Sequence, residues 1–309
     1  LSRVLAWSSP LDLTALAGCL GSTACTVTQI TTGLILGTLL FLVASGLSLI
    51  FGVLGVINFA HGAFYMLGAY FAYAAYLATG SFLVAFLAGA AGMAIFGALF
   101  ETLFLRRIYG RDVLMQLLLC YAFVLILDDV VKIVWGAEYK MMGLPQEFAV
   151  PPFFVLGGPV PAYYAFMIAT AVVVGAVLWF AIARTRFGKI VRAAAINPQM
   201  VGALGINTTL LYAGVFALGS MLAGAAGALA APVRTLTPGM GLSILIESFI
   251  VTVIGGMGSI VGAFVAALLI GSIRAFGSIG FPLFVDGLMF LMMALVLVLK
   301  PSGLFGKQV

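Results

Sequence analysis

Residues 29–51 have the sequence QITTGLILGTLLFLVASGLSLIF, and residues 52–62 continue with GVLGVINFAHG. The first segment carries no charged side chain and is long enough to cross the roughly 30 Å hydrocarbon layer of a membrane as one helix. In the second segment, two glycines flank a short apolar turn, and Asn58 and the only histidine, His61, follow. Irregular backbone at membrane depth is tolerated only where protein or a water-filled cavity surrounds it. The two segments therefore predict a membrane-spanning helix followed by a discontinuous one.

The interrupted segment has two interpretations. In the functional one, Asn58 and His61 supply hydrogen bonds beside a solute path at a helix break. In the other, the segment is an ordinary turn between two spans, and Asn58 caps the next helix. The residues alone favour neither.

The composition is that of a membrane protein. Of 309 residues, 64% are hydrophobic and 7% are charged, against about 25% charged residues in an ordinary soluble domain. A mean hydropathy of +1.27 excludes a cytosolic enzyme, a secreted disulfide scaffold and a disordered chain. The basic residues behind the net charge of +5 lie in short clusters, which suits membrane orientation rather than nucleic-acid binding. We expect an all-α, polytopic membrane protein.

Further apolar runs follow the first. They occupy residues 62–79, 82–105, 114–135, 162–183, 208–230, 242–276 and 282–299. The run at 242–276 is too long for one span, and its centre, Gly255-Gly256-Met257-Gly258-Ser259, favours a reversal of the chain. The sequence therefore predicts eight transmembrane helices, or nine if the chain turns back at these glycines.

Basic clusters set the expected orientation, because cytoplasmic loops of membrane proteins carry an excess of Lys and Arg. Nine of the fourteen basic residues lie in three segments, at 106–111, 184–192 and 300–307. All three segments can be cytoplasmic only if an even number of transmembrane helices separates each segment from the next. A reversal of the chain at residues 255–259 meets this condition, and so the charges favour nine helices. The N-terminus is then expected outside and the C-terminus in the cytoplasm.

The first 28 residues are expected to form a short periplasmic or interfacial segment, and residues 29–309 the transmembrane domain. Leu16-Ala17-Gly18-Cys19 matches a bacterial lipoprotein cleavage box. However, Pro10 and Asp12 interrupt the apolar stretch that such a signal needs. We therefore prefer the unprocessed segment.

Small residues four apart mark faces where membrane helices approach closely. This spacing occurs at Gly33/Gly37, Ser220/Gly224 and Gly258/Gly262. Packing within the chain is the preferred interpretation, and contact between subunits is the alternative.

Charged residues inside the apolar runs need partners, because an unpaired charge at the bilayer centre is costly. Asp128 and Lys132 lie four residues apart on one helix and are expected to pair. Glu101 and Arg106 are expected to pair near the inner surface.

Glu247 has no partner within its own apolar run. It must face protein or water. We expect it to contact Arg234, Arg274 or an amine of a ligand.

Residues 184–207 form the polar segment expected on the cytoplasmic side. Residues 187–195 are amphipathic and basic. Asn197-Pro198 is a strong start signal for a second short helix, because an N-cap is followed by proline at the first helical position. We expect this second helix to end at Gly205.

The second helix places Met200, Val201 and Leu204 on one face. Apolar side chains presented to the cytosol either lie on the membrane or dock into a partner protein. The adjacent Gly202 and Ala203 favour a small knob that fits a pocket. We therefore expect docking.

Motifs of several enzyme classes are absent from the sequence. It has no GxxxxGK[ST] phosphate loop and no HExxH motif. No nucleophile elbow lies near His61, and Cys19, Cys25 and Cys120 lack metal-binding or redox spacing. We expect neither an enzyme nor a bound cofactor or metal.

Three stretches of the chain resemble one protein family. Residues 46–62, GLSLIFGVLGVINFAHG, together with FYMLGAY at 64–70, strongly resemble the signature of the first permease subunit of branched-chain amino acid ABC importers. Residues 192–207 resemble the cytoplasmic ATPase-docking loop of that family, and VIGGMGSIVG at 253–262 is the third match. The resemblance covers the chain from about residue 29 to residue 307.

The resemblance implies a transmembrane subunit of an ATP-driven importer in a bacterial inner membrane. The implied partners are a second, related permease subunit, two ABC ATPase subunits, a periplasmic solute-binding protein, membrane lipid and a small solute; ATP is used by the partner subunits. We expect the translocation pathway beside Asn58, His61, Tyr65 and Glu247. The expected ATPase-docking residues are Arg192, Asn197, Pro198, Met200, Val201, Gly202 and Leu204.

One position departs from the family pattern. Many members carry an acidic residue directly after the His-Gly pair, where this chain has Ala63. An acidic group there would suit an ammonium-bearing solute. Branched-chain amino acids remain the first expectation, beside urea, short amides and aromatic or other carboxylates.

An alternative of a different class is an ATP-independent channel or facilitator formed by this chain alone. A passive pore would have no need of a structured cytoplasmic segment such as residues 184–207.

Overall fold

The computed structural model describes residues 12–306 and is predominantly α-helical. Its elements are α1 (Leu13–Gly21), α2 (Thr23–Leu54), α3 (His61–Thr79), α4 (Phe82–Leu103), η1 (Leu105–Ile108), α5 (Val113–Trp135), η2 (Gln146–Phe148), β1 (Phe153–Val155), β2 (Gly158–Val160), α6 (Ala162–Arg184), α7 (Arg186–Ile196), α8 (Pro198–Ala203), α9 (Thr208–Ala230), α10 (Met240–Gly255), α11 (Ile260–Gly280) and α12 (Val285–Leu299). The two strands pair antiparallel as a short hairpin.

Each predicted apolar run forms a helix, and the run at 242–276 forms two, because α10 ends at Gly255 and α11 begins at Ile260. Gly256, with a φ of 96°, has the left-handed backbone that the turn between them requires. Five helices are long and apolar enough to cross a membrane, namely α2, α4 with η1, α6, α9 and α11. α10 and α12 are apolar but shorter. The predicted polytopic all-α architecture is confirmed.

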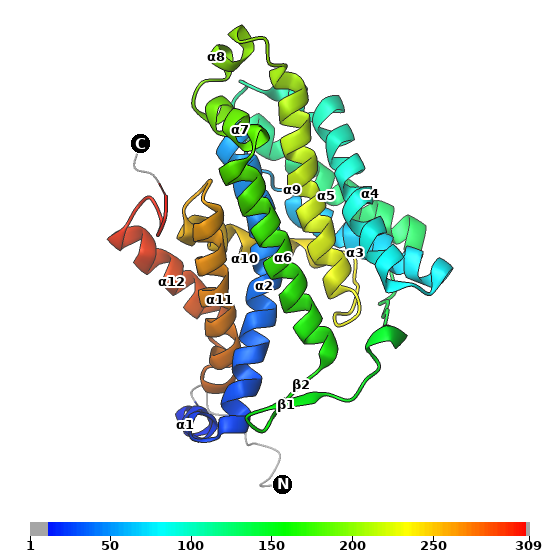
Figure 1. The fold of residues 1–309 in the computed structure, drawn as a ribbon, viewed down its shortest axis with the longest axis vertical. Coiled ribbons are helices and arrows are strands. Elements are labelled where there is room, and N and C mark those ends of the chain that lie inside the picture. Colours follow the sequence, from blue (N-terminus) through cyan, green and yellow to red (C-terminus); the bar gives the residue numbers. More distant parts are fainter. Residues whose placement is uncertain (1–11, 307–309) are drawn as a thin grey trace.

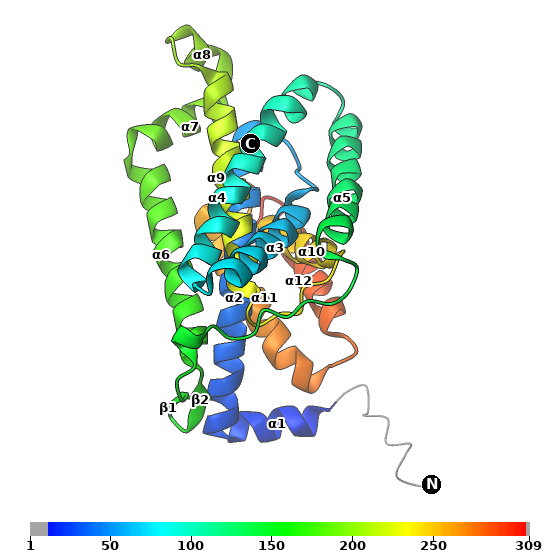
Figure 2. The ribbon, with the colours of Figure 1, turned by 90° about the vertical axis from the view of Figure 1, so that its right-hand side faces the viewer.

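Helices α2, α6, α9 and α11 run roughly along the long axis of the molecule (Figure 1). α7, α8 and the connection between α4 and α5 lie at one end, and α1 and the β1–β2 hairpin lie at the other (Figure 2). The basic clusters at 106–111 and 184–192 therefore share one end of the molecule. We call it the α8 end, and the opposite one the α1 end.

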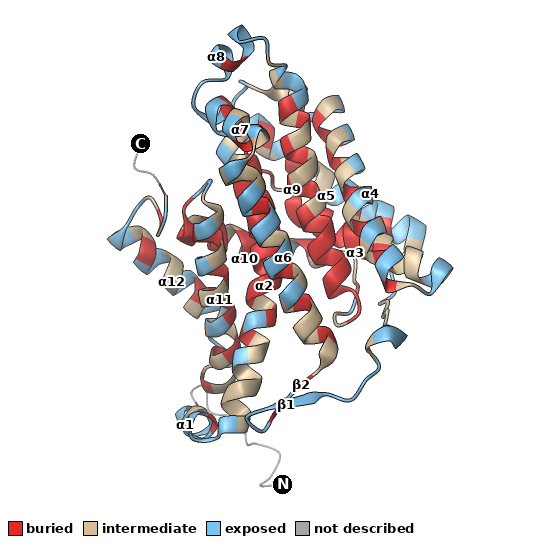
Figure 3. Ribbon diagram, in the orientation of Figure 1, coloured by how far each residue is buried: buried red, intermediate tan, exposed pale blue. Residues whose placement is uncertain are grey.

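The core of the molecule is centred on α2, α9 and the first turns of α3 (Figure 3). Glycines bring the helix backbones close together there. A Cβ added at Gly33 or Gly37 would meet the backbone of α11, one at Gly224 would meet α4, and one at Gly262 would meet the backbone of Gly255. The small-residue pairs thus pack within the chain, as preferred from the sequence.

Helix α2 begins at Thr23, before the predicted start at residue 29. Ser22 caps its first turn, and the hydroxyls of Thr28 and Thr31 donate to helix carbonyls one turn earlier. Because these hydroxyls form their hydrogen bonds with the backbone of α2 itself, the helix continues through a stretch that is polar in sequence.

A disulfide joins Cys19 at the end of α1 to Cys25 in the first turns of α2. The spacing argument missed it, because the bond depends on the sharp turn between the two helices at Ser22. Disulfides persist in oxidising compartments, which agrees with an α1 end outside the cytoplasm. Pro10, part of the argument about a lipoprotein signal, lies outside the described residues.

The predicted pair of Asp128 and Lys132 is wrong. Lys132 instead pairs with Asp129 at 3.0 Å, and Asp128 Oδ1 accepts a hydrogen bond from the backbone N–H of Gly239 at 2.8 Å. Asp128 is thus used to hold the connection between α9 and α10, a long-range contact that local spacing does not reveal.

Candidate translocation site and docking helix

The break between α2 and α3 is shaped by Asn58. Its Oδ1 accepts a hydrogen bond from the backbone N–H of Ala60 at 3.1 Å, and its backbone carbonyl accepts one from His61 N at 3.2 Å. Asn58 is fully buried, and its side-chain amide nitrogen has no hydrogen-bond partner among the described residues. The Asn58 oxygen therefore organises the turn, while the amide nitrogen keeps unused hydrogen-bonding capacity.

His61 fixes the start of α3 against the middle of α2. Its Nε2 lies 3.0 Å from the carbonyl oxygen of Val43, and the ring is fully buried beside Gly46. Nδ1 has no partner among the described residues. This contact holds α3 at mid-height, so that its first turn starts inside the bundle rather than at its surface (Figure 2).

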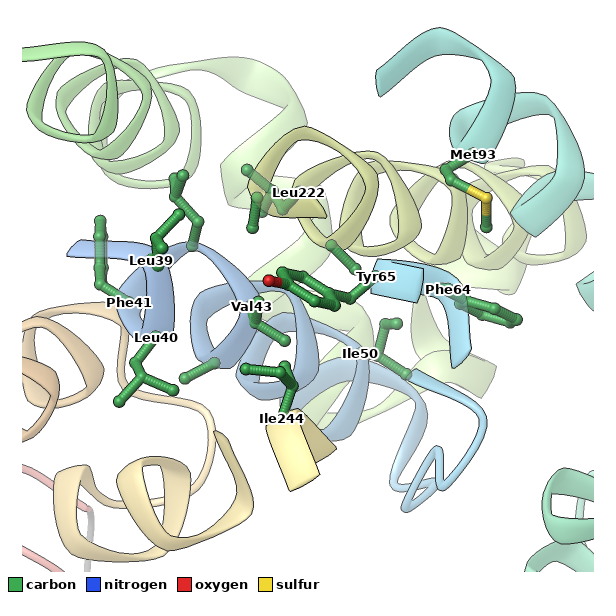
Figure 4. Close-up of a cluster of buried hydrophobic side chains, with 14 of the residues drawn as sticks. Leu39, Leu40, Phe41, Val43, Ile50, Phe64, Tyr65, Met93, Leu222 and Ile244 are labelled. Carbon is green, nitrogen blue, oxygen red and sulfur yellow. The ribbon is translucent and has the colours of Figure 1, made fainter. Parts of the chain in front are cut away.

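Tyr65 lies one turn further along α3. Figure 4 shows its ring among Val43 of α2, Leu222 of α9 and Ile244 of α10. The side chain is buried and its hydroxyl has no hydrogen-bond partner by distance and angle. The Arg234 guanidinium and the Glu247 carboxylate are near enough to interact electrostatically with this hydroxyl.

Glu247 of α10 forms an ion pair with Arg274 of α11. The carboxylate is almost completely buried, and the guanidinium is partly exposed. Of the three contacts that the sequence left open for Glu247, the structure has the one with Arg274. The pair neutralises a charge that would otherwise be costly inside a membrane.

Helices α3 and α10 approach each other through Gly62 and Gly241. A Cβ on either glycine would overlap the backbone of the other helix. Both helices start at this contact, so the starts of two discontinuous helices meet near the middle of the molecule.

A cavity of about 370 Å³ lies beside the interrupted segment. Leu47, Ile57, Asn58 and Phe59 line one side of it. Residues of α10 and α12 line the other side, namely Leu242, Leu245, Ile246, Phe249, Ile250, Phe290 and Met293. The cavity is strongly apolar, so it suits an apolar part of a solute better than a charged one.

The four predicted pathway residues do not all lie at one cavity. Asn58 lines the apolar cavity, whereas Glu247 pairs with Arg274. Cys120 of α5 is a buried free cysteine, and the sequence offered no indication of its burial, because a single cysteine in an apolar run carries no such signal.

The predicted docking segment forms two short helices, α7 and α8. Asn197 Oδ1 caps α8 by accepting from Met200 N at 2.9 Å, and Pro198 occupies the first turn. Arg192 on α7 donates to the carbonyl of Ile182 at the end of α6, which fixes the angle between these helices. The predicted helix start at Asn197-Pro198 is confirmed.

The apolar side chains of α8 do not all point outward. Met200 and Leu204 are 61% and 74% exposed, and Ile196, which sequence reasoning missed, is 84% exposed. Val201 is only 3% exposed, so its predicted place on the presented face is wrong. It packs inward because its carbonyl accepts from Ile206 N, which folds the chain back over it. A Cβ at Gly202 would meet nothing within 4 Å.

A polar cluster links α4 to the start of α9 just after α8. Arg106 donates to the fully buried carboxylate of Glu101 at 2.8 Å, as predicted, and more weakly to the carbonyl of Thr209 at 3.4 Å. Tyr109 donates its hydroxyl to Glu101 at 3.0 Å. Burial and the adjacent Glu101 carboxylate raise the pKa of Tyr109 well above its usual value. The cluster therefore ties the end of α4 and the residues that follow it to the first turn of α9.

Known proteins resemble this chain over most of its length. Residues 29–297 match the family described as branched-chain amino acid transport system / permease component. The permease protein BraD of Pseudomonas aeruginosa, described as part of a high-affinity branched-chain amino acid transport system, is 32% identical over 90% of this chain and 95% of its own length. LivH of Escherichia coli, with the same description, is 29% identical over the same shares.

A probable LivH of Methanocaldococcus jannaschii is 27% identical over 88% of this chain and 90% of its own length. No solved structure matches the chain. Helices α3 to α11, the interrupted segment and residues 184–207 fall within the matched residues. The chain therefore belongs to the family of permease components of branched-chain amino acid transport systems.

Proposed function

We propose that this permease subunit of an ABC importer carries branched-chain amino acids into a bacterial cell. The observation that carries the proposal is the match of residues 29–297 to the family, together with relatives whose names specify this solute class. The apolar cavity beside Asn58 supports it, because an aliphatic side chain gains free energy when it leaves water for such a space.

Transport in this proposal is driven from the cytoplasmic side. One of the two ATPase subunits docks at the exposed face of α8, formed by Ile196, Met200 and Leu204. The α8 end and the C-terminus are then cytoplasmic, as the basic clusters favour. A second, related permease completes the pathway, and a periplasmic binding protein delivers the solute to the α1 end.

The buried polar groups support a gate rather than a permanently open pore. His61, Tyr65 and Glu247 are buried within the chain, so a solute reaches them only after helices move. ATP-driven closure of the ATPases would shift the population of the permease between its two conformations. The Gly62–Gly241 contact is where such a movement would separate α3 from α10.

The test is uptake into proteoliposomes that contain the complete importer with ATP inside and the solute-binding protein outside. We expect uptake of L-leucine, L-isoleucine and L-valine that depends on ATP hydrolysis. Uptake of another solute in their place would overturn the solute assignment. Equal leucine flux without ATP would instead support the channel alternative.

A further inference from the structure

Helix α6 packs mainly on α2 and, at its end, on α7, and two apolar cavities lie along its contact with α2. The first has a volume of about 450 Å³. Among the residues that line it are Val27 and Leu34 of α2, Ala165 and Ala169 of α6, and Val155 and Val160 of the β1–β2 hairpin. The second, of about 210 Å³, continues along α6 from Val172 to Trp179. We call the two cavities together the α6 groove.

The α6 groove is suited to a hydrocarbon chain. The one polar side chain among its lining residues is Thr31, and its hydroxyl already donates to the carbonyl of Val27 at 2.8 Å. From Ala165 to Trp179 the helix rises about 21 Å. One leaflet accounts for about half of the roughly 30 Å hydrocarbon layer of a membrane, so the groove is long enough to hold an acyl chain along its length.

The β1–β2 hairpin occupies the end of the α6 groove that lies at the α1 end of the molecule (Figure 1, Figure 2). A Cβ added at Gly158 would lie 2.8 Å from the side chain of Val27, so the hairpin packs directly on α2. Helix α6 begins at Ala162, directly after the hairpin, and has 23 residues. These rise about 34 Å, close to the thickness of the hydrocarbon layer. The hairpin therefore lies at the boundary of this layer.

The hairpin presents apolar side chains at this boundary. Phe154 and Leu156 are 70% and 78% exposed, and the sequence has no charged residue between Glu147 and Arg184. Leu156 has a φ of 48°, a left-handed conformation that glycine or asparagine adopts more readily than a bulky side chain does. Exposed aromatic and aliphatic side chains without charges suit the interfacial layer of a membrane better than water.

The hairpin also distinguishes between two possible occupants of the groove. A transmembrane helix of another subunit is about 10–12 Å wide with its side chains and must cross the whole membrane. It would have to continue past the hairpin, which closes the groove between α2 and α6 at the α1 end. An acyl chain ends below the headgroup layer and needs no such passage. The geometry therefore favours a lipid.

We propose that the α6 groove binds an acyl chain of a phospholipid from the leaflet at the α1 end, with the β1–β2 hairpin at the level of the lipid headgroup. The bound chain fills the space between α6 and α2. Since Arg192 of α7 donates to the carbonyl of Ile182 near the end of α6, the lipid supports the helix that carries the docking segment. The site does not depend on which solute the permease transports.

The first experiment counts phospholipid that stays bound after purification. The complete importer is washed in mild detergent and analysed by native mass spectrometry, which releases the permease chain with its bound lipid. We expect a bound phospholipid on the wild-type chain. Ala169→Phe places a ring in the groove and should lower the bound fraction about tenfold, because the filled site can hold a chain only at the cost of overpacking. Val173→Phe is the matched control, because Val173 is 60% exposed on α6 and lines neither cavity.

The second experiment maps the acyl chain in a bilayer. The importer is reconstituted into vesicles of phosphatidylethanolamine and phosphatidylglycerol, with a trace of phosphatidylglycerol that carries a diazirine on one acyl chain. After irradiation, peptide mass spectrometry locates the cross-links. We expect more cross-links at residues 27–34 and 165–169 than at the exposed Val173. The wild-type cross-links test the proposal independently of how well Ala169→Phe folds.

Three outcomes would overturn the proposal. Equal retention of phospholipid by Ala169→Phe and Val173→Phe would show that the groove holds no lipid. Cross-links at the groove no more frequent than at Val173 would show ordinary contact with the surrounding bilayer only. Cross-links at Val173 with none at residues 27–34 would show that a protein subunit covers the groove. None of these outcomes changes the proposed function, which is tested by uptake.

Discussion

At the scale of single residues, the contact between α3 and α10 leaves no room for a side chain. We expect Gly62→Ala to destabilise the permease by about 1–3 kcal/mol, the usual cost of overpacking, because the new Cβ meets the backbone of Gly241 and the Cβ of Leu245. Thermal unfolding of the purified chain measures this. Gly214→Ala in α9 is the control, because nothing lies within 4 Å of its Cβ position. Equal unfolding midpoints for the two variants would contradict the close contact.

Tyr109 gives a prediction about pH. Its pKa is raised by burial and by Glu101, so the folded state holds its proton more tightly than the unfolded state does. The stability that this provides is fully present below a pH of about 10, the ordinary tyrosine value, and is lost as the pH rises further. The wild type should therefore lose more stability than Tyr109→Phe between neutral pH and strongly alkaline pH. Tyr139→Phe, at an exposed position, should behave as the wild type, and a parallel decline of all three would refute the prediction.

The residue contacts that the sequence predicted are local ones. The Glu101–Arg106 pair and the Asn197 cap join residues a few positions apart, so spacing alone indicates them. The bond of Asp128 to Gly239 joins residues from distant parts of the chain. Nothing in the pattern around Asp128 distinguishes this partner from Lys132, and so the predicted pair was wrong.

At the scale of elements, α8 depends on its cap more than a long helix does. Asn197 caps α8 at 2.9 Å, and Asn207 caps α9 in the same way at 3.0 Å. Loss of either cap costs about 1 kcal/mol, but a helix as short as α8 has little else to stabilise it. We expect Asn197→Ala to reduce ATP-dependent uptake severely and Asn207→Ala only slightly. Similar uptake by the two variants would argue against α8 as the docking element.

The disulfide between α1 and α2 predicts that the α1 end lies on the outer side of the membrane. A membrane-impermeant maleimide added to intact spheroplasts should label Cys19 and Cys25 only after treatment with a reductant. Cys120 is buried in α5 and should stay unlabelled, so the Cys19→Ser/Cys25→Ser double variant is the control. Labelling of the wild type without reductant would show free thiols, and no labelling after reduction would place the α1 end inside.

The sequence predicted elements well wherever hydropathy determines them. Each apolar run forms a helix, and the glycines at 255–258 separate α10 from α11, as their backbone freedom suggested. The start of α2 was harder to predict from the sequence. Its threonine hydroxyls are polar, and they gain their hydrogen-bond partners only once the helix has formed. The burial of the Val201 side chain likewise depends on how residues 201–206 fold back over it.

At the scale of the whole molecule, the family and the polytopic architecture follow from the sequence, whereas the candidate site follows only in part. Tyr65 and Glu247 were predicted beside the pathway on separate grounds. Their shared neighbourhood with Arg234 and Arg274 depends on how α3, α10 and α11 pack. Because α3 is distant in sequence from α10 and α11, only the folded chain brings Tyr65 close to the helix that carries Glu247.

The central claim is that ATPase subunits drive this permease through α8. Its most direct test is purification of the tagged chain from its native membranes in mild detergent, followed by measurement of ATP hydrolysis. The wild type should bring down ATPase subunits and hydrolyse ATP. Met200→Arg should be recovered in equal amount without them, while Met141→Arg, at another exposed position that lies between α5 and α6, should behave as the wild type. Recovery of the wild-type chain alone, with no ATP hydrolysis, would contradict the account.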